Sequence, residues 1–299
     1  MRPLHLAATL AIIEGLDCNP GLDMDWLRHR TLDDPTCFPD LLLVAEVGDE
    51  IVGFCFGCVR GERGVIKFFG VSKRHRRTGI ATTLLNEIEA RLGARGVSKI
   101  IVGGVAPNVF VPGVPILETA AIALLMQRGY TSNRVARVDM AVDLQRANLD
   151  SAASEQRLAG QGIVLGRAFL EEVDAASEFA RVAFSENWGV EVSETARFDP
   201  LPLFIALDGD RVVGFAASET TGRSRFGPTG TDPDYRRRGI GGALLKMCLR
   251  GIRDRGESLA TIGWVGPIGF YARAVGARVS KGFWVFEKSM EEDVPSTQG

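Results

Sequence analysis

Apolar segments and turns follow one another in the same order twice along this chain of 299 residues. In each half, an apolar segment meets a turn of glycine and aspartate and continues into a second apolar segment, which predicts a β-hairpin. A third predicted strand follows each hairpin. These segments are residues 41–47, 51–60 and 65–71 in the first half, and 203–207, 212–218 and roughly 225–231 in the second.

Each set of three strands leads into an amphipathic helix, where apolar residues recur every three or four positions. A buried-looking strand, a second helix and a closing strand complete each half. The sequence therefore predicts an α+β fold, in which each half has a mixed, mostly antiparallel sheet flanked by helices. The helical positions are Ile80, Leu84, Leu85, Ile88 and Leu92, repeated as Ile240, Leu244, Leu245, Cys248 and Ile252; the later elements are expected near 99–105, 119–128 and 135–144, and near 258–264, 268–275 and 279–287.

The two halves are copies of one pattern. The run Arg76-Arg77-Thr78-Gly79-Ile80-Ala81 overlies Arg236-Arg237-Arg238-Gly239-Ile240-Gly241 at an offset of 160 residues. Agreement of this kind indicates an internal duplication, and the length fits two domains of about 150 residues each. The sequence predicts a first domain at 1–146, a linker rich in Ala, Ser and Gln at 147–160, a second domain at 161–290 and a flexible tail at 291–299.

Composition narrows the choice of partners. Hydrophobic residues make up 45% of the chain and charged residues 24%, as in ordinary globular proteins. The formal net charge of −2 provides no general attraction to nucleic acid or to an anionic membrane. No stretch approaches the ~20 apolar residues of a membrane span, and the start lacks the apolar core of a secretory signal. We therefore expect a cytoplasmic protein that binds neither nucleic acid nor membranes.

The five cysteines are scattered and odd in number, which argues against a disulfide framework and for a reducing compartment. Cys55 and Cys58 form a C-x-x-C within a predicted strand, where residues three apart point to opposite faces. No second pair of this kind occurs in the sequence. We interpret both as small core residues rather than as metal ligands or a redox pair, and we expect no metal.

The repeated turn has a definite chemical use. It connects a predicted strand to a helix, whose first N–H groups lack intrahelical partners and whose dipole is positive at that end. A glycine lets the backbone approach a ligand closely, and the preceding arginines add positive charge. Two such turns in register therefore predict a cradle for a pyrophosphate in each half.

Other phosphate-binding motifs fit less well. Neither half has the G-x-x-x-x-G-K-(S/T) pattern of a P-loop, and the shared spacing begins with arginine rather than with the first glycine of a dinucleotide fingerprint. The basic run at 73–77 could indicate a nucleic-acid patch, but its counterpart at 232–236 retains only the final arginine. The shared function is therefore assigned to the Arg–Gly turn.

Both runs resemble motif A of the GCN5-related N-acetyltransferases (GNAT), and the likeness extends over most of both halves. The resemblance implies two tandem GNAT domains, a layout similar to mycothiol synthase and to glucosaminide N-acetyltransferases. It also implies that each turn binds the pyrophosphate of acetyl-CoA, while the preceding strand offers backbone groups to the pantetheine and the acetyl carbonyl. The residues so implied are Phe69, Val71, Arg76, Arg77, Thr78, Gly79, Ile80 and Ala81 in the first half, and Thr229, Thr231, Arg236, Arg237, Arg238, Gly239, Ile240, Gly241 and Gly242 in the second.

The family's mechanism is direct acetyl transfer within a ternary complex, often with a tyrosine that protonates the leaving CoA thiolate. Tyr271 matches this tyrosine, although its ring could instead serve only to pack at a helix start. Trp264 stands where the family often has an asparagine, which leaves one pantetheine contact open. Either Val111 or Leu124 aligns with Tyr271 in the first half, and neither side chain can donate a proton to sulfur.

The general base and the acceptor site are less well marked. Glu186, Glu191 and Glu194 lie where the family's substrate loop usually falls, and Asp232 follows the central strand. Glu186 is the leading candidate for the base, with a solvated surface acid as the alternative for each of the four. Trp188 in the same segment could stack on a sugar ring or anchor the core. The insertion 108–118, stiffened by two prolines and a glycine, could line a pocket between the two domains or form a plain surface loop. Residues 1–4 are expected to form an abbreviated first strand.

The sequence thus predicts an acetyl-CoA-dependent N-acetyltransferase that acts on a primary amine of a small molecule. An amino sugar or another amino-bearing metabolite is implied by the resemblance alone. The second half is expected to be catalytic because only it retains the tyrosine, and the first half is expected to be degenerate or accessory. Two alternatives are a non-catalytic acyl-CoA-binding sensor and catalysis by the first half.

Overall fold

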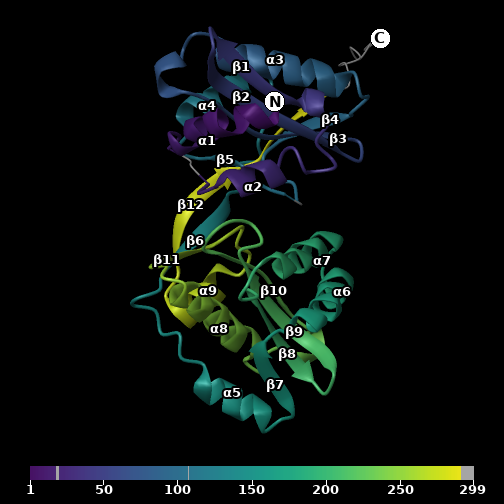
Figure 1. The fold of residues 1–299 in the computed structure, drawn as a ribbon, viewed down its shortest axis with the longest axis vertical. Coiled ribbons are helices and arrows are strands. Elements are labelled where there is room, and N and C mark those ends of the chain that lie inside the picture. The colour runs from purple at the N-terminus through teal and green to yellow at the C-terminus, as the bar shows by residue number, and fades with distance from the viewer. Residues whose placement is uncertain (18–19, 107, 291–299) are drawn as a thin grey trace, which may run out of the picture. The chain divides into compact units, whose positions relative to one another are not determined.

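The computed structural model describes residues 1–17, 20–106 and 108–290 (Figure 1). Its contacts divide the chain into two compact units. The first comprises Met1–Arg137 together with the segment from Gly282 onward, and the second comprises Val138–Lys281. The predicted flexible tail at 291–299 lies outside the described residues. Within the described part of the chain, no helix is long and apolar enough to cross a membrane.

A five-stranded sheet forms the centre of the first unit, in the order β1-β2-β3-β4-β13. Neighbouring strands are antiparallel except β3 and β4, which run parallel. Helix α3 packs on β2 and β3, and a 3-10 turn at Pro3–His5 replaces the strand expected at 1–4, because the helix α1 follows directly. The elements are α1 (Leu6–Glu14), α2 (Met24–His29), β1 (Leu42–Val47), β2 (Glu50–Arg60), β3 (Arg63–Val71), α3 (Ile80–Gly93), β4 (Lys99–Val102), β5 (Val114–Pro115), α4 (Thr119–Gln127) and β13 (Phe286–Ser289).

The second unit has the same plan. Its strands follow the order β12-β6-β11-β10-β9-β8-β7, and from β6 to β7 all neighbouring strands are antiparallel except the parallel pair β10 and β11. Helix α8 packs on β8, β9 and β10, and α6 packs on β9. The elements are β6 (Arg137–Asp143), α5 (Ala152–Ala159), β7 (Ile163–Arg167), α6 (Val173–Ala183), α7 (Glu186–Ser193), β8 (Leu203–Asp208), β9 (Arg211–Ser218), β10 (Arg225–Thr231), α8 (Ile240–Asp254), β11 (Leu259–Ile262), α9 (Ile268–Val275) and β12 (Arg278–Trp284).

The closing strands are exchanged between the two halves of the sequence. Strand β6 ends the first half but pairs with β11 in the second unit, where Val142 lies opposite Ala260. Strand β13 ends the second half but pairs with β4 in the first unit, where Phe286 lies opposite Val102. The domain limits expected at 146 and 290 therefore differ from the limits of the compact units, because an apolar strand pattern does not specify which of two equivalent sheet edges the strand joins.

The segment expected to be a linker is partly helical. Helix α5 lies within residues 147–160, buries Leu158 completely and packs on α8 and β7. This segment is therefore part of the second unit. Its Ala, Ser and Gln content suits a short helix as well as a linker, so composition alone does not distinguish the two.

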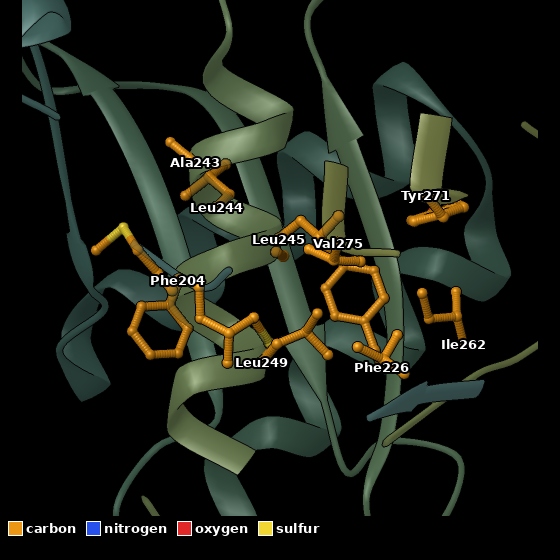
Figure 2. Packing of buried hydrophobic residues seen from close by; sticks show 14 of the residues in the cluster. Phe204, Phe226, Ala243, Leu244, Leu245, Leu249, Ile262, Tyr271 and Val275 are labelled. Carbon is orange, nitrogen blue, oxygen red and sulfur yellow. The ribbon is translucent and has the colours of Figure 1, made fainter. Parts of the chain in front are cut away.

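Helices α3 and α8 bury the faces that their periodicity predicts. In the second unit, Leu245 and Leu249 of α8 pack with Phe204 and Phe226 of the sheet in one buried cluster (Figure 2). Complete burial of a leucine or phenylalanine side chain contributes about 1.5–3 kcal/mol. This packing fixes the helix axis on the sheet, so the first turn of the helix is held beside the end of β10.

Candidate functional site

In each sheet, one strand of the parallel pair continues beyond the residues that pair with the other strand. Strand β3 pairs with β4 as far as Ile66 and then continues to Val71. Strand β10 pairs with β11 only through Phe226 and continues to Thr231. Each strand also carries a bulge directly after the paired residues. The unpaired inner edge therefore leaves backbone groups available to an extended ligand.

At the end of each of these strands, the chain makes the same turn into a helix. Gly79 and Gly239 precede α3 and α8 with φ angles of 88° and 92°, a conformation that glycine adopts without strain. Because the N-cap residue of each helix is glycine, neither helix has an N-cap side chain that bonds to its first N–H groups. Both turns therefore present free backbone donors at the positive end of a helix dipole.

One arginine has the same structural contact in both turns. Arg76 Nε donates to Val71 O, and Arg236 Nε donates to Thr231 O, each at 3.3 Å. These two arginines therefore brace the end of the strand against the turn, in addition to supplying charge. Identical contacts in the two copies support the predicted register of the repeat.

A cavity of about 530 Å³ lies over the turn of the first unit. This cavity is lined by all the first-half residues that the family resemblance implies for acetyl-CoA binding, with the exception of Thr78. A Cβ at Gly79 would meet nothing within 4 Å, so the cradle is open. The insertion 108–118 contributes Val111, Gly113 and Glu118 to the lining of this cavity, all of whose lining residues belong to the first unit, so a place in a pocket between the domains stays a prediction.

A buried charged cluster surrounds Lys67, which also lines this cleft. Lys67 Nζ donates to Asp34 Oδ2 and to Arg30 O, each at 2.6 Å, and all three residues are at most 4% exposed. The ring of Phe110, from the insertion, has its centroid 5.6 Å from Lys67 Nζ and 5.8 Å from Arg30 Cζ. Burial raises the pKa of Asp34, but Lys67 and Thr36 outweigh this effect and lower the pKa to about 2. The cluster therefore fills the interior beside the bulge of β3 with a buried ion pair, and Arg60 makes a second ion pair with Asp34 at 3.3 Å.

Replacing Lys67 by Met is expected to destabilise the protein by about 3–5 kcal/mol, because it removes the closer of the two cations that pair with the buried carboxylate of Asp34 and leaves only Arg60, at 3.3 Å. The double variant Lys67→Met/Asp34→Leu should recover part of this loss, since the carboxylate is then no longer buried without its ammonium, although Arg60 loses its carboxylate partner. Chemical denaturation measures both changes. Lys73→Met, at an exposed ion pair with Asp17, is the control and should cost less than about 1 kcal/mol. A similarly small loss for Lys67→Met would show that the buried pair does not matter for stability.

Cys55 and Cys58 are both completely buried, as the strand pattern predicts. Cys55 belongs to the core that α3 covers. Cys58 lies beside Cys37 and Lys67; a hydrogen bond with Cys37 and the nearby cations lower the pKa of Cys58 to about 6, although burial opposes them. Among the residues with described positions, no group of three or more side chains could hold a metal ion.

The turn of the second unit has close neighbours that the first lacks. A Cβ at Gly239 would lie 2.7 Å from Nη2 of Arg157, and one at Gly241 would lie 3.4 Å from Oγ1 of Thr231. Thr229 donates its hydroxyl to Phe215 O at 2.9 Å, so only its backbone is available to a ligand. Arg157 is absent from the predicted set because no motif in its sequence surroundings marks it.

Tyr271 lies on α9 and is 7% exposed (Figure 2). Its ring meets the rings of Phe226 and Phe270 edge to face. Burial raises the pKa of Tyr271 to about 12, so the phenol keeps its proton at neutral pH. Among the described residues, its hydroxyl has no hydrogen-bond partner. The two possible first-half counterparts of this tyrosine, Val111 and Leu124, both line the cleft of the first unit and carry no acid.

The two candidate residues of the substrate segment are placed differently. Glu186 begins α7 with 75% of its side chain exposed and forms an ion pair with Arg181 at 2.9 Å. No contact links it to Tyr271 within the described part of the chain, so its role as base stays a prediction. Trp188 stacks on Phe184, with ring centroids 5.0 Å apart, in the core of α6, α7 and the sheet. It therefore anchors the core.

A buried ion pair lies where β10 and β11 separate, and sequence reasoning did not find it. Asp139 of β6 is 2% exposed and pairs with Arg225 of β10 at 3.0 Å. Asp139 Oδ1 also accepts the backbone N–H of Trp264 at 2.8 Å, which holds Trp264 at a φ of 47°. Because β6 comes from the other half of the sequence, only knowledge of the strand exchange could have revealed this pair.

Two family models match the chain. The Acetyltransferase (GNAT) family matches residues 14–111, and the Acetyltransferase (GNAT) domain matches residues 199–274. Each match includes the parallel strand that extends beyond its partner and the turn that follows it. The second match also includes Tyr271. The chain therefore belongs to the GNAT acetyltransferase family and contains two of its domains, as the sequence predicts.

Individual proteins support the same assignment. An acetyltransferase of Photorhabdus laumondii is 43% identical over 83 residues, which are 28% of this chain and 56% of the relative. The chain spans about half the length of the curated relatives it matches. A GCN5-related N-acetyltransferase from Sphaerobacter thermophilus has a TM-score of 0.70 at 20% identity, covering 98% of this chain and 95% of that one. A GCN5-related glucosamine N-acetyltransferase region of a fungal multi-domain β-N-acetylglucosaminidase has a TM-score of 0.72 at 20% identity, covering 96% and 37%. Both structures share the fold.

Proposed function

We propose that this protein transfers an acetyl group from acetyl-CoA to a primary amine of a small molecule, with the second unit as the catalytic domain. The observation that carries the proposal is the combination, within one unit, of the opened edge of β10, the free donors before α8 and the protonated Tyr271 on α9. Membership of the GNAT family supports acetyl-CoA as the acetyl donor.

The residues of the second unit fit the donor. Acetyl-CoA would supply the acetyl group as an activated thioester. The free N–H groups of the first turn of α8 suit a pyrophosphate, and Arg237 and Arg238 add positive charge beside them. Gly242 leaves open space at this turn, whereas a side chain at Gly241 would press on Thr231. The edge of β10 leading to Thr231 suits the pantetheine arm, because it has no strand partner beyond Phe226.

Tyr271 is the candidate acid of the proposed reaction. Because its pKa is about 12, the phenol holds its proton at the pH at which the enzyme would work. A proton is needed when the thiolate leaves, and a side chain in position to donate it contributes a rate factor of about 10²–10⁴. The acceptor must arrive as a neutral amine, since an ammonium with a pKa of about 10.4 is not nucleophilic.

The first unit supports an accessory role. It has the same turn and an open cleft, but the residues available opposite Tyr271 are apolar. The buried cluster of Lys67, Asp34 and Arg30 occupies the interior beside its bulged strand. The first unit is therefore proposed to bind acetyl-CoA weakly or to serve structurally.

The acceptor class is supported by one neighbour. The fungal region of similar fold is described as a glucosamine N-acetyltransferase, which makes an amino sugar the first acceptor to test. Two other readings stand beside the proposal. One is an acyl-CoA-binding sensor without turnover. It is favoured by the position of Glu186, whose exposed carboxylate pairs with Arg181 and is not linked to Tyr271 in the described part of the chain. The other is catalysis by the first unit, which its open cleft favours.

A thiol-release assay tests the proposal. Purified full-length protein is incubated with acetyl-CoA and a panel of primary amines that includes glucosamine, simple alkyl amines and lysine peptides. We expect amine-dependent release of CoA thiol for at least one small amine, with the acetylated product identified by mass spectrometry. Binding of acetyl-CoA without release across the whole panel would instead support the sensor.

A further inference from the structure

Helix α5 is held firmly against α8 by several polar contacts. Arg250 Nη2 donates to Ser151 Oγ at 3.2 Å, and Lys246 Nζ donates to Asp150 O at 2.9 Å. Leu158 of α5 is completely buried in the core that α8 shares. The residues of α5 therefore have fixed positions relative to the first turn of α8.

Arg157 projects from this helix to the second cradle. Its Nη2 would lie 2.7 Å from a Cβ at Gly239, which places the guanidinium directly beside the turn. Arg157 is exposed and has neither a hydrogen bond nor an ion pair among the described residues. At the corresponding place in the first unit, a Cβ at Gly79 would meet no described residue within 4 Å. The second copy of the repeat has thus gained a cation that the first copy lacks.

This position is electrostatically unfavourable without an anion. The start of α8 carries the positive end of the helix dipole, and Arg236, Arg237 and Arg238 stand in the same turn. A further guanidinium adds to this repulsion, and an exposed arginine without a partner can turn toward solvent. An anion seated between the guanidinium and the free N–H groups would remove the repulsion and form charge-assisted hydrogen bonds.

We propose that Arg157 is a ligand for the pyrophosphate of coenzyme A in the second unit. This inference rests on the proposed function, because it takes the turn at Gly239 as the CoA cradle. It adds a residue from outside the repeated motif, carried by a helix in the segment that composition assigns to a linker. A guanidinium suits this role because it can donate two parallel N–H bonds to phosphate oxygens.

Isothermal titration calorimetry with free CoA tests the proposal without any acceptor or turnover. The titrations use full-length protein carrying Gly79→Glu, so that the second cradle is the remaining site; Arg77→Glu replaces this background if Gly79→Glu does not fold. Arg157→Gln is expected to weaken CoA binding about five- to tenfold, in line with the loss of one charge-assisted contact that is partly exposed. Arg157→Lys should recover part of the affinity, and the difference should shrink at high salt.

Three controls make the outcome decisive. Arg146→Gln removes the same charge from an exposed arginine that pairs with Asp143, and it should leave CoA affinity unchanged. Circular dichroism melting checks that each variant is folded. Dephospho-CoA, which keeps the pyrophosphate but lacks the 3′-phosphate, should show the same loss with Arg157→Gln.

Unchanged affinity in Arg157→Gln would overturn the proposal, as would tighter binding, which would show that Arg157 blocks the cradle. A loss seen with CoA but not with dephospho-CoA would also overturn it, because the contact would then be to the 3′-phosphate. If wild type binds CoA but never turns over, the proposed enzymatic function fails while this inference stands. The two failures are therefore distinguishable.

Discussion

Gly239→Glu is expected to abolish acetyl transfer, with turnover falling by more than about 100-fold. The substitution places a carboxylate in the second cradle, where it would pair with Arg157 and repel a pyrophosphate. Loss of two charge-assisted hydrogen bonds of about 1.5–3 kcal/mol each is sufficient for a change of this size. Steady-state thiol release measures the effect, and calorimetry with CoA shows whether binding is lost.

Gly79→Glu is the matched control. Gly79 occupies the same place in the first unit, has a φ of 88° against 92° for Gly239, and would suffer the same backbone strain on substitution. We expect this variant to reduce turnover only partly, through any accessory role of the first cleft. Loss of turnover in Gly79→Glu, together with an active Gly239→Glu, would assign catalysis to the first unit.

Tyr271→Phe is expected to lower kcat by about 100-fold with little change in CoA affinity, because it removes one proton donor and keeps the ring. The ring contacts with Phe226 and Phe270 should hold α9 in place. Wild-type activity should show no loss from ionisation of this phenol until the pH approaches the pKa of about 12. Rates and CoA dissociation constants measured on the same preparation separate catalysis from binding.

Tyr130→Phe is the control, because it removes a buried phenol hydroxyl at a place outside the proposed site. Tyr130 lies in the first unit, is 2% exposed and donates its hydroxyl to Glu89 at 3.1 Å. Its substitution should cost about 1.5–3 kcal/mol of stability, since the lost hydrogen bond is to a carboxylate, and leave kcat unchanged. Equal kcat values for Tyr271→Phe and wild type would remove the acid role of Tyr271 and leave it a packing residue.

The local architecture could be predicted from the sequence because it depends on patterns that lie close together along the chain. The helical spacing that ends in Leu92 and Ile252 specifies α3 and α8, and the left-handed glycines at 79 and 239 specify where these helices begin. The cradle follows from the same local features. For this reason the turn residues of the first unit, with the exception of Thr78, line one cleft.

Features that depend on distant pairing could not be predicted. The apolar pattern of β6 fits the edge of either sheet, so the sequence did not reveal that Asp139 reaches Arg225. The contact of Lys67 with Asp34 likewise joins segments whose closeness follows only from the fold. Arg157 lacks any motif, and its closeness to Gly239 results from the packing of α5 on α8. Residues beside the motif therefore required the three-dimensional structure.

Because of the strand exchange, the first unit cannot be completed until the end of the second half has been synthesised. The first unit lacks its edge strand until residues 286–289 have been made, although its other strands are complete by about the middle of the chain. At typical elongation rates this interval is on the order of ten seconds, during which the edge of β4 is open to wrong partners. A nascent chain that stops early can therefore never hold a finished first domain. We expect the ribosome-bound first half to depend on chaperones or on β6 as a temporary partner until the last strand emerges.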